Sequence, residues 1–324
     1  MSDKSPLNQP IDLAFTRPGG ADGTIAEPTF SGALSFMRRR YSKDLAGADV
    51  AVVGIPFDLA TTGRPGSRYG PRAIRLGSSM IAWDAVWGWD FDPFDRLDVI
   101  DHGDLAIDYG SPIEVVGTIE RQFAAIHRQG VATLMLGGDH FCTYPVLRSL
   151  TKELGKPLSL IHFDAHSDTW PAKEGHVDHG TMFWRAAKDG LVDPARSIQL
   201  GIRTNNKDTL GFTVLSAEDI DRLSAEEIAT CVASVVGDNP AYLTFDVDFL
   251  DPAFAPGTGT PVAGGIGTIK AFGILRRLAG LDIRSADVVE VAPAYDAGDV
   301  TALSAATVGL HCLALMAARP NSSA

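Results

Sequence analysis

Three groups of acidic residues and histidines stand directly after three apolar runs of this sequence. Together they offer four carboxylates and two imidazoles: His140, Asp164, His166, Asp168, Asp246 and Asp248. Six ligands are too many for one ordinary metal site, whereas two divalent cations about 3.5–4 Å apart would use them all by sharing bridging carboxylates. A structural zinc site fits less well, because zinc prefers four Cys or His ligands. The sequence therefore indicates a metal-dependent hydrolase.

The spacing of these ligands favours their convergence. Asp164, His166 and Asp168 occupy alternate positions, and so do Asp246 and Asp248. Alternate residues of an extended strand face the same side, so each group can point at one place if the extended geometry continues past the strand end. Acidic loop ends that face water are the alternative, and they would explain the pair Asp246 and Asp248 by itself. The three groups together favour a metal site.

Composition limits the partners and the compartment. The 324 residues carry a net charge of -12, which argues against nucleic acid and favours a cationic substrate. Three scattered cysteines without a CxxC motif are typical of the reducing cytoplasm, and the N-terminus shows no signal-peptide pattern. The longest apolar stretch, 302–318, contains polar residues and is short for a membrane span. We therefore expect it to be a buried helix and expect no membrane contact.

Apolar runs alternate with helical patterns along the chain. We expect strands near residues 49–55, 97–101, 131–136, 158–163, 197–202, 212–215, 241–246 and 284–291. We expect helices near residues 71–79, 112–129, 143–154, 180–189, 223–236, 268–279 and 302–318. This alternation predicts a mainly parallel sheet with helices on both faces. Ligands of such sheets bind beyond the carboxyl ends of the strands, which is where all three groups stand.

The chain shows no internal linker. Residues 31–324 are predicted to form one domain. Residues 1–30, which are rich in Pro, Gly and polar residues, are predicted to be an N-terminal extension.

Two further residues are candidates for catalysis or substrate binding. His179 follows Asp168 by eleven residues and precedes a helical pattern. A histidine there can deliver a proton to a leaving amine, although a structural or solvated role is the alternative. Glu290 is flanked by valines at a strand end, where an unpaired buried carboxylate would be costly. Glu290 therefore either forms a structural salt bridge with another residue or binds a planar cation of the substrate, such as guanidinium.

The chain resembles the ureohydrolase family, which includes the arginases and the agmatinases. The segments that match the family's metal signatures are Gly137-Gly-Asp-His140, Asp164-Ala-His-Ser-Asp168 and Thr244-Phe-Asp-Val-Asp248. The similarity extends over the rest of the chain after the N-terminal extension. It is greatest to bacterial agmatinases, in the stretches Pro56–Gly63, Asp178–Phe183 and Val289–Asp296. The resemblance implies an arginase-like α/β fold, a three-layer α/β/α sandwich around a mainly parallel eight-stranded sheet.

The resemblance also implies a role for each candidate. One metal ion would be bound by His140, Asp164, Asp168 and Asp246. The other would be bound by His166, Asp164, Asp246 and Asp248. His179 corresponds to the family's proton-transferring histidine, Asp168 would accept a hydrogen bond from the attacking oxygen, and Glu290 would bind the guanidinium group of the substrate. The expected cofactor is two Mn²⁺ ions, with Ni²⁺ as the alternative, and the expected assembly is a homo-oligomer, a trimer or hexamer.

The predicted reaction is the hydrolysis of agmatine to putrescine and urea. One alternative is another guanidino substrate, namely 4-guanidinobutyrate, guanidine or an alkylated biguanide. The other is a non-catalytic paralogue that supports an active subunit in a hetero-oligomer, although the complete ligand set argues against it.

The identity of the substrate's tail is the most open of these expectations. Tyr69 stands where a histidine is more typical of the family, and the loop 169–178 differs in length. Glu174 and Asp178 in this loop outweigh Lys173 and favour a cationic tail, whereas Arg64 and Arg68 could receive a carboxylate.

Overall fold

An eight-stranded sheet forms the centre of the protein. The computed structural model describes residues 12, 15–19, 24–82 and 85–320. In chain order the strands of the sheet are β3 Val50–Gly54, β4 Val99–Asp104, β5 Ala132–Leu136, β6 Ser159–Phe163, β7 Ile198–Ile202, β8 Thr213–Ser216, β9 Ala241–Asp246 and β10 Ile283–Val289. They lie in the order β4-β3-β5-β10-β9-β6-β7-β8, and all neighbouring pairs are parallel. The predicted eight-stranded parallel sheet is confirmed.

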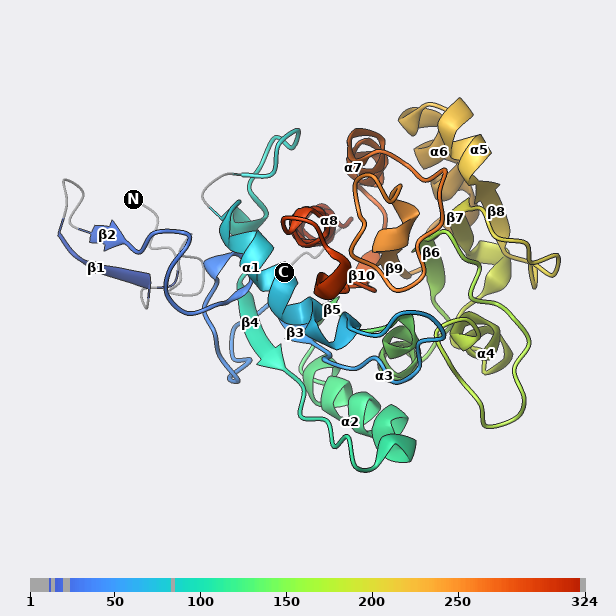
Figure 1. Ribbon diagram of the computed structural model, residues 1–324, viewed down its shortest axis with the longest axis horizontal. Coiled ribbons are helices and arrows are strands. Elements are labelled where there is room, and N and C mark those ends of the chain that lie inside the picture. The colour runs from blue at the N-terminus through green and yellow to red at the C-terminus, as the bar shows by residue number, and fades with distance from the viewer. Residues whose placement is uncertain (1–11, 13–14, 20–23, 83–84, 321–324) are drawn as a thin grey trace.

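Helices cover both faces of the sheet and complete the predicted three-layer α/β/α sandwich (Figure 1). The described residues contain α1 Gly70–Ser79, α2 Val115–His127, α3 Thr143–Leu154, α4 Met182–Lys188, α5 Ala217–Arg222, α6 Ala225–Val236, α7 Thr268–Arg277 and α8 Val300–Ala317. Side chains of α1 and of α5 to α8 share one core with one face of the sheet, and those of α2 to α4 share a second core with the other face. Because both faces are covered, β5 and β9 are buried at every position.

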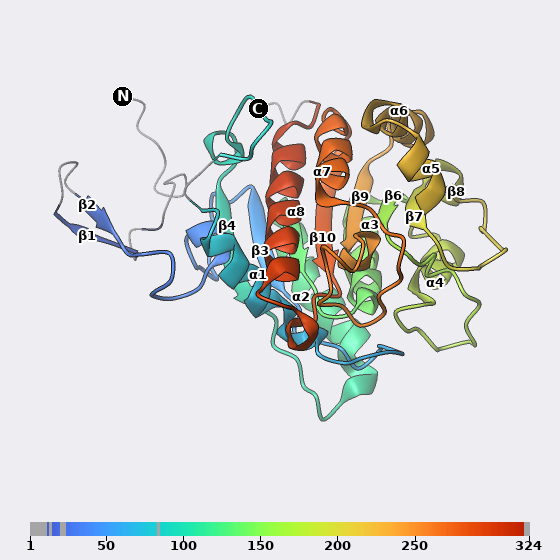
Figure 2. The same cartoon turned by 45° about the horizontal axis from the view of Figure 1, so that its top comes forward.

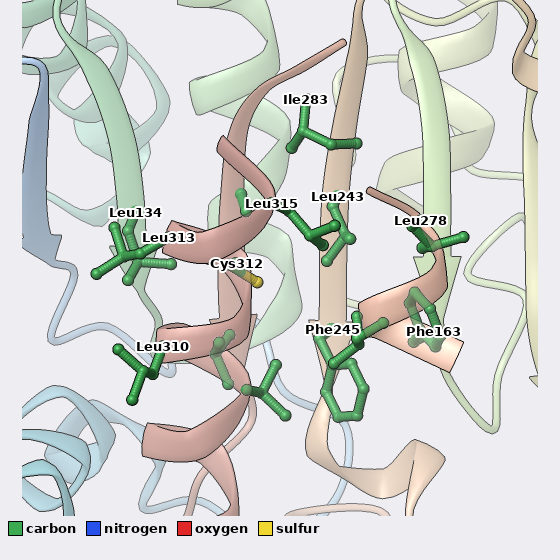
Figure 3. Close-up of a cluster of buried hydrophobic side chains, with 14 of the residues drawn as sticks. Leu134, Phe163, Leu243, Phe245, Leu278, Ile283, Leu310, Cys312, Leu313 and Leu315 are labelled. Atoms are coloured by element: carbon green, nitrogen blue, oxygen red, sulfur yellow. The ribbon is translucent and has the colours of Figure 1, made fainter. Parts of the chain in front are cut away.

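Helix α8 packs on the middle of the sheet, and Figure 2 shows it beside α7 and in front of β10. In Figure 3, Leu313 of α8 and Leu134 of β5 belong to one cluster of fully buried apolar side chains. Burying such a side chain stabilises the fold by about 1.5–3 kcal/mol. Among the described residues, α8 is the one helix whose length and composition would suit a membrane span, but 78% of that span is buried inside the protein. It is the buried helix that the sequence predicts.

Two features of the fold were not predicted. Strands β1 Thr16–Pro18 and β2 Thr24–Ala26 pair antiparallel inside the predicted N-terminal extension and lie to one side of the sheet (Figure 1). Residues 1–11, 13–14 and 20–23 of that extension lie outside the described residues. Helix α5 begins at a capping box between Ser216 and Asp219. The Ser-x-x-Asp pattern of this box was readable in the sequence.

The order of the strands decides where the site forms. Strands β9 and β10 come last in the chain but are inserted between β5 and β6. The four central neighbours are therefore β5, β10, β9 and β6. Because they are parallel, the segments that follow them start at one edge of the sheet. These are the segments that carry the candidate residues.

Candidate active site

All six predicted metal ligands lie at the carboxyl edge of the central strands. His140 begins a short 3₁₀ helix, η7 His140–Cys142, after β5. The segment 164–168 follows β6, Asp246 ends β9, and Asp248 lies in a second 3₁₀ helix, η9 Val247–Phe249. Five of the six side chains are buried, and His166 is partly exposed. The structure therefore brings together the residues that the sequence singled out.

His140 faces three carboxylates. Its Nδ1 lies 3.0 Å from Asp164 Oδ2, 3.0 Å from Asp168 Oδ2 and 3.5 Å from Asp246 Oδ2. Its Nε2 lies 2.7 Å from the hydroxyl oxygen of Thr244, which itself donates to a buried aspartate. The hydroxyl must therefore accept from Nε2–H, which leaves a lone pair on Nδ1.

The lone pair on Nδ1 tests whether a metal fits. This buried nitrogen has no hydrogen-bond partner in the described part of the chain, although carboxylates surround it. A nitrogen lone pair and several carboxylate oxygens repel one another unless a cation lies between them. The ligand atoms around His140, one imidazole nitrogen and several carboxylate oxygens, therefore fit a divalent cation.

A second group of ligands forms around His166. Its Nδ1 lies 3.0 Å from Asp248 Oδ2 and 3.4 Å from Asp164 Oδ1. Asp248 Oδ2 is buried and has no hydrogen-bond partner among the described residues, while Asp248 Oδ1 accepts from the amide of Ala165 at 3.0 Å. Asp164 thus presents one oxygen to His140 and the other to His166. This sharing is the geometry of a bridging carboxylate between two cations.

The carboxylates crowd one another electrostatically. Burial and the nearby Asp248 and Asp164 raise the pKa of Asp246 well above its usual value. Burial and Asp164 likewise raise the pKa of Asp248 to about 6. Burial would also raise the pKa of Asp164, but His162 and His140 outweigh it and hold that pKa well below its usual value. Divalent cations would neutralise this excess negative charge.

The ligands converge for a different reason from the one predicted. The extended backbone of β6 ends at Phe163, and the chain bends at residues 165–166. Asp168 has a positive φ of 52°, and Asp248 lies in a 3₁₀ turn. Alternation along an extended strand therefore does not aim these side chains. Turns in the backbone direct these side chains to one place. One of the turns contains Asp168 in the left-handed region, which strains the backbone.

His179 and Glu290 meet each other. His179 Nδ1 donates to Glu290 Oε1 at 2.9 Å. Glu290 Oε1 also accepts from the amide of His140 at 2.9 Å, while Glu290 Oε2 is buried without a hydrogen-bond partner in the described ranges. A salt bridge from Glu290 to Arg or Lys does not occur among the described residues. Oε2 is therefore the oxygen that is left for a ligand. If Glu290 bound a guanidinium through two parallel hydrogen bonds, the second bond would go to Oε1, which already accepts from His140 and His179.

Two contacts act on the charge of His179 in opposite directions. Burial lowers its pKa, but Glu290 outweighs burial and raises the pKa to about 9. Nε2, however, lies 2.8 Å from the amide nitrogen of Thr62, which can only donate. The contact with Thr62 requires a lone pair on Nε2. The neutral tautomer is thus the one this geometry holds, and protonation requires that contact to open.

A pocket of about 330 Å³ opens beside the ligands. Its lining residues are Thr62, His166, Asp168, Trp170, Asp178, His179, Gly180, Thr181, Asp246 and Thr260. Tyr69, Arg64 and Arg68 are not among them. Arg68 pairs with Asp58 at 2.6 Å, and the guanidinium of Arg64 stacks on Tyr295 at 4.5 Å. The loop 169–178 borders the pocket through Trp170 and Asp178, as predicted, but the two arginines face other partners.

The chain is similar to known proteins over most of its length. A model of the Arginase family matches residues 48–315. This chain belongs to the arginase family.

An agmatinase from Chromobacterium violaceum is 47% identical over 298 residues, which cover 92% of each chain. The crystal structure of a hypothetical agmatinase from Burkholderia thailandensis has a TM-score of 0.90 and 50% identity, with 95% of this chain and 98% of that chain covered. A proclavaminate amidino hydrolase from Streptomyces clavuligerus has a TM-score of 0.83 and 35% identity, with 90% and 99% covered.

Membership of the arginase family implies a binuclear divalent-metal site, and the buried cluster fits one. Two groups of ligand atoms close enough to bind an ion occur among the described residues, and Asp164 belongs to both.

Sequence reasoning missed His162. Its Nε2 donates to Asp164 Oδ2 at 2.7 Å, and its Nδ1 accepts from the side chain of Gln199 at 3.1 Å. Both ring nitrogens are thus engaged, so His162 orients the shared carboxylate. A signal was available, because His162 lies in β6 and precedes Asp164 by two residues.

Proposed function

We propose that this chain hydrolyses agmatine to putrescine and urea at a binuclear metal centre. The observation that carries the proposal is Asp164, which is shared between two His/Asp groups beside a pocket with an acidic wall. Relatives named agmatinase align with most of the chain, which supports the same activity here.

The metal roles are those that the family resemblance implies, and the contacts of His140 and His166 with Asp164 support them. One ion would be bound by His140, Asp164, Asp168 and Asp246. The other would be bound by His166, Asp164, Asp246 and Asp248. The ligands are mostly carboxylates, which suits Mn²⁺, and Ni²⁺ is the alternative. When bound, such a pair of ions lowers the pKa of a water molecule and so supplies a nucleophile at neutral pH.

Glu290 would hold the substrate's guanidinium through its free oxygen. Oε2 is buried and unpartnered in the described part of the chain, and Oε1 is fixed by His140 and His179. A carboxylate restrained in this way is preorganised, because it need not reorient when a cation arrives. Its positive φ of 65° shows that the backbone is strained at this residue.

Asp168 and His179 would manage the protons. Asp168 lines the pocket and accepts a hydrogen bond from the attacking oxygen, which keeps that oxygen aimed at the guanidino carbon. His179 lines the same pocket and supplies the proton that the departing amine needs. Despite burial, Glu290 raises the pKa of His179 to about 9, so His179 can carry that proton at neutral pH once its contact with the Thr62 amide opens.

The pocket wall favours a cationic tail. Burial would raise the pKa of Asp178, but hydrogen bonds from Thr181, His176 and Gly180 outweigh burial and lower it, so Asp178 is ionised at neutral pH. Trp170 offers an aromatic surface on the same wall. An ammonium tail is attracted there, whereas the carboxylate of 4-guanidinobutyrate would be repelled.

A substrate panel tests this function. The purified chain is assayed for urea release from agmatine, 4-guanidinobutyrate, guanidine and an alkylated biguanide, with Mn²⁺ and with Ni²⁺. We expect agmatine to have the highest kcat/KM and to exceed 4-guanidinobutyrate at least about tenfold, or about 1.4 kcal/mol. A higher value for an acid-tailed or tailless guanidine would contradict agmatine as the substrate. No urea from any of them would favour the non-catalytic paralogue.

We further propose a homo-oligomer, a trimer or hexamer, in the cytoplasm, with the ureohydrolase domain spanning residues 31–324. A hetero-oligomer with a paralogue is the alternative, and light scattering of the purified chain would separate the two.

A further inference from the structure

Thr62 covers the ring nitrogen through which His179 would have to act. His179 Nδ1 is engaged by Glu290 Oε1 at 2.9 Å. His179 Nε2 lies 2.8 Å from the amide nitrogen of Thr62 and 2.7 Å from its hydroxyl oxygen. Both ring nitrogens are therefore occupied, and neither is left to meet the substrate directly.

The hydroxyl of Thr62 is placed between His179 and the pocket. Thr62 lines the pocket beside His179, and its side chain is exposed. Across the described residues, His179 Nε2 is the sole hydrogen-bond partner of Thr62 Oγ1. An oxygen with lone pairs to spare, a proton of its own and access to the pocket can pass a proton onward.

The segment before Thr62 is held firmly. The amide of Ala60 donates to Asp139 Oδ2 at 2.8 Å, and the carbonyl of Ala60 accepts from the amide of His179 at 3.3 Å. His179 and Thr62 are therefore tied to each other through the backbone as well as through the ring. These backbone contacts hold His179 beside the segment that carries Thr62.

We propose that Thr62 is a further catalytic residue whose hydroxyl relays a proton from His179 to the departing amine, which rests on the function proposed above. Once the contact from the Thr62 amide has opened and His179 is protonated, the proton on His179 Nε2 moves to Thr62 Oγ1 while the hydroxyl proton of Thr62 moves to the amine nitrogen. The C–N bond breaks and its electron pair stays on that nitrogen. The proton on the oxygen that attacked passes to Asp168, the guanidino carbon becomes the carbonyl carbon of urea, Thr62 is restored, and His179 is left neutral.

Two variants of Thr62 isolate the hydroxyl. T62V keeps the shape and the backbone amide but loses the hydroxyl, and T62S keeps the hydroxyl. Both are assayed with agmatine in the metal-loaded enzyme, with metal content measured for each. We expect T62V to lose about 10²-fold in kcat, at the lower end of general acid–base effects, and T62S to stay within about threefold of the wild type. Both should retain wild-type metal content. A T62V variant with wild-type kcat, or a T62S variant as slow as T62V, would overturn the relay.

Two measurements separate a relay from a hydroxyl that merely orients His179. In the first, agmatine is replaced by its oxyguanidine analogue, in which oxygen replaces the methylene next to the guanidine. Its leaving alkoxyamine is far less basic and needs little protonation, so the loss of kcat in T62V should shrink to under about threefold; an equal loss on both substrates would refute proton delivery.

In the second measurement, kcat of the wild type is plotted against the fraction of D₂O in mixtures of H₂O and D₂O. The plot should be curved, because two protons move in one step. A linear dependence would show one moving proton, and Thr62 would then only position His179.

The proposed function and the relay fail in different ways. If the wild-type enzyme releases no urea from agmatine, both proposals are wrong. If the wild type and T62V hydrolyse agmatine equally well, only the relay is wrong.

Discussion

Asp246 lies where the carboxylates of the cluster are most crowded. Its side chain is buried, and Asp248 and Asp164 reinforce burial in raising its pKa. A residue in this position gains most from a shared cation. Asp246→Asn keeps the shape and the acceptor for the Asp248 amide, which is 2.8 Å away, but it removes the charge.

We expect purified Asp246→Asn to bind well under two ions per chain. The metal-free variant should unfold at a temperature no lower than the metal-free wild type, because burial and the neighbouring carboxylates disfavour ionisation of Asp246, whereas a neutral amide has no charge to bury. Added Mn²⁺ should raise that temperature much less than in the wild type, since ligands stabilise a fold according to their affinity for it. Metal analysis and thermal unfolding with and without chelator would measure both. Asp282→Asn, at the opposite end of the sheet from the cluster, is the control and should behave like the wild type. Two retained ions in Asp246→Asn would contradict the bridging role.

Residue types revealed the ligands but not their partners. His140, Asp164 and Asp246 were predicted because few other combinations of residues suit two divalent cations. The hydrogen bonds that orient them could not be read in the same way. Thr62 meets His179 across 117 positions of the chain, and no local pattern marks such a contact. The pairing of His179 with Glu290 has the same origin.

The connection from β5 to η7 is the element that links the two halves of the site. Gly138 donates its amide hydrogen to the carbonyl of Ile55 at 2.8 Å, and its own carbonyl accepts from the amide of Glu290 at 2.9 Å. A Cβ at Gly138 would lie 1.7 Å from the carbonyl oxygen of Phe57. Backbone cannot yield as a flexible side chain does, so only glycine fits here.

Gly138→Ala should push the β3 loop away from the β5 loop. We expect a loss of about 1–3 kcal/mol in the free energy of unfolding of the metal-free protein, the usual scale of overpacking. We also expect weaker metal binding, because both His140 and Glu290 are attached to this turn. Urea unfolding and metal titration would measure the two effects. Gly273→Ala in α7 is the control, since its Cβ would meet only ordinary contact at 3.7 Å. It should be neutral or slightly stabilising. A Gly138→Ala variant with wild-type stability would show that the loop can relax.

Helices and strands can be predicted where the pattern of apolar residues extends over enough positions to tell a helix from a strand or a loop. All eight strands of the main sheet and the helices other than α5 were found in this way. Helix α5 and the β1–β2 pair were missed because each spans only a few residues. The strand order was not predicted, since the insertion of β9 and β10 between β5 and β6 depends on long-range pairing. The turns after β6 and β9 follow from that packing too.

At the scale of the whole molecule, buried histidines tie the layers together. His127, the last residue of α2, contacts Ser149 of α3 at 2.8 Å and Thr133 of β5 at 3.2 Å. Burial lowers the pKa of His127 to about 4. On the other face, His311 of α8 accepts from the indole of Trp89 at 2.9 Å, and burial together with Arg276 lowers its pKa to about 3. Both imidazoles are therefore neutral in the folded protein across the mildly acidic range.

These depressed pKa values make the fold sensitive to mild acid. An unfolded histidine titrates near pH 6.5, so the unfolded chain binds a proton below that pH while folded His127 does not until about pH 4. Stability is therefore lost as pH falls from about 6.5 to about 4, by about 2 kcal/mol from His127 between pH 7 and pH 5. His127→Gln, which cannot titrate, should be less stable at pH 7 but should lose about 2 kcal/mol less over that interval. Urea unfolding of metal-free protein at fixed concentration would measure the difference, with the largely exposed His176→Gln as the control. Equal pH slopes for His127→Gln and the wild type would mean that His127 takes up its proton in the folded state as readily as in the unfolded chain.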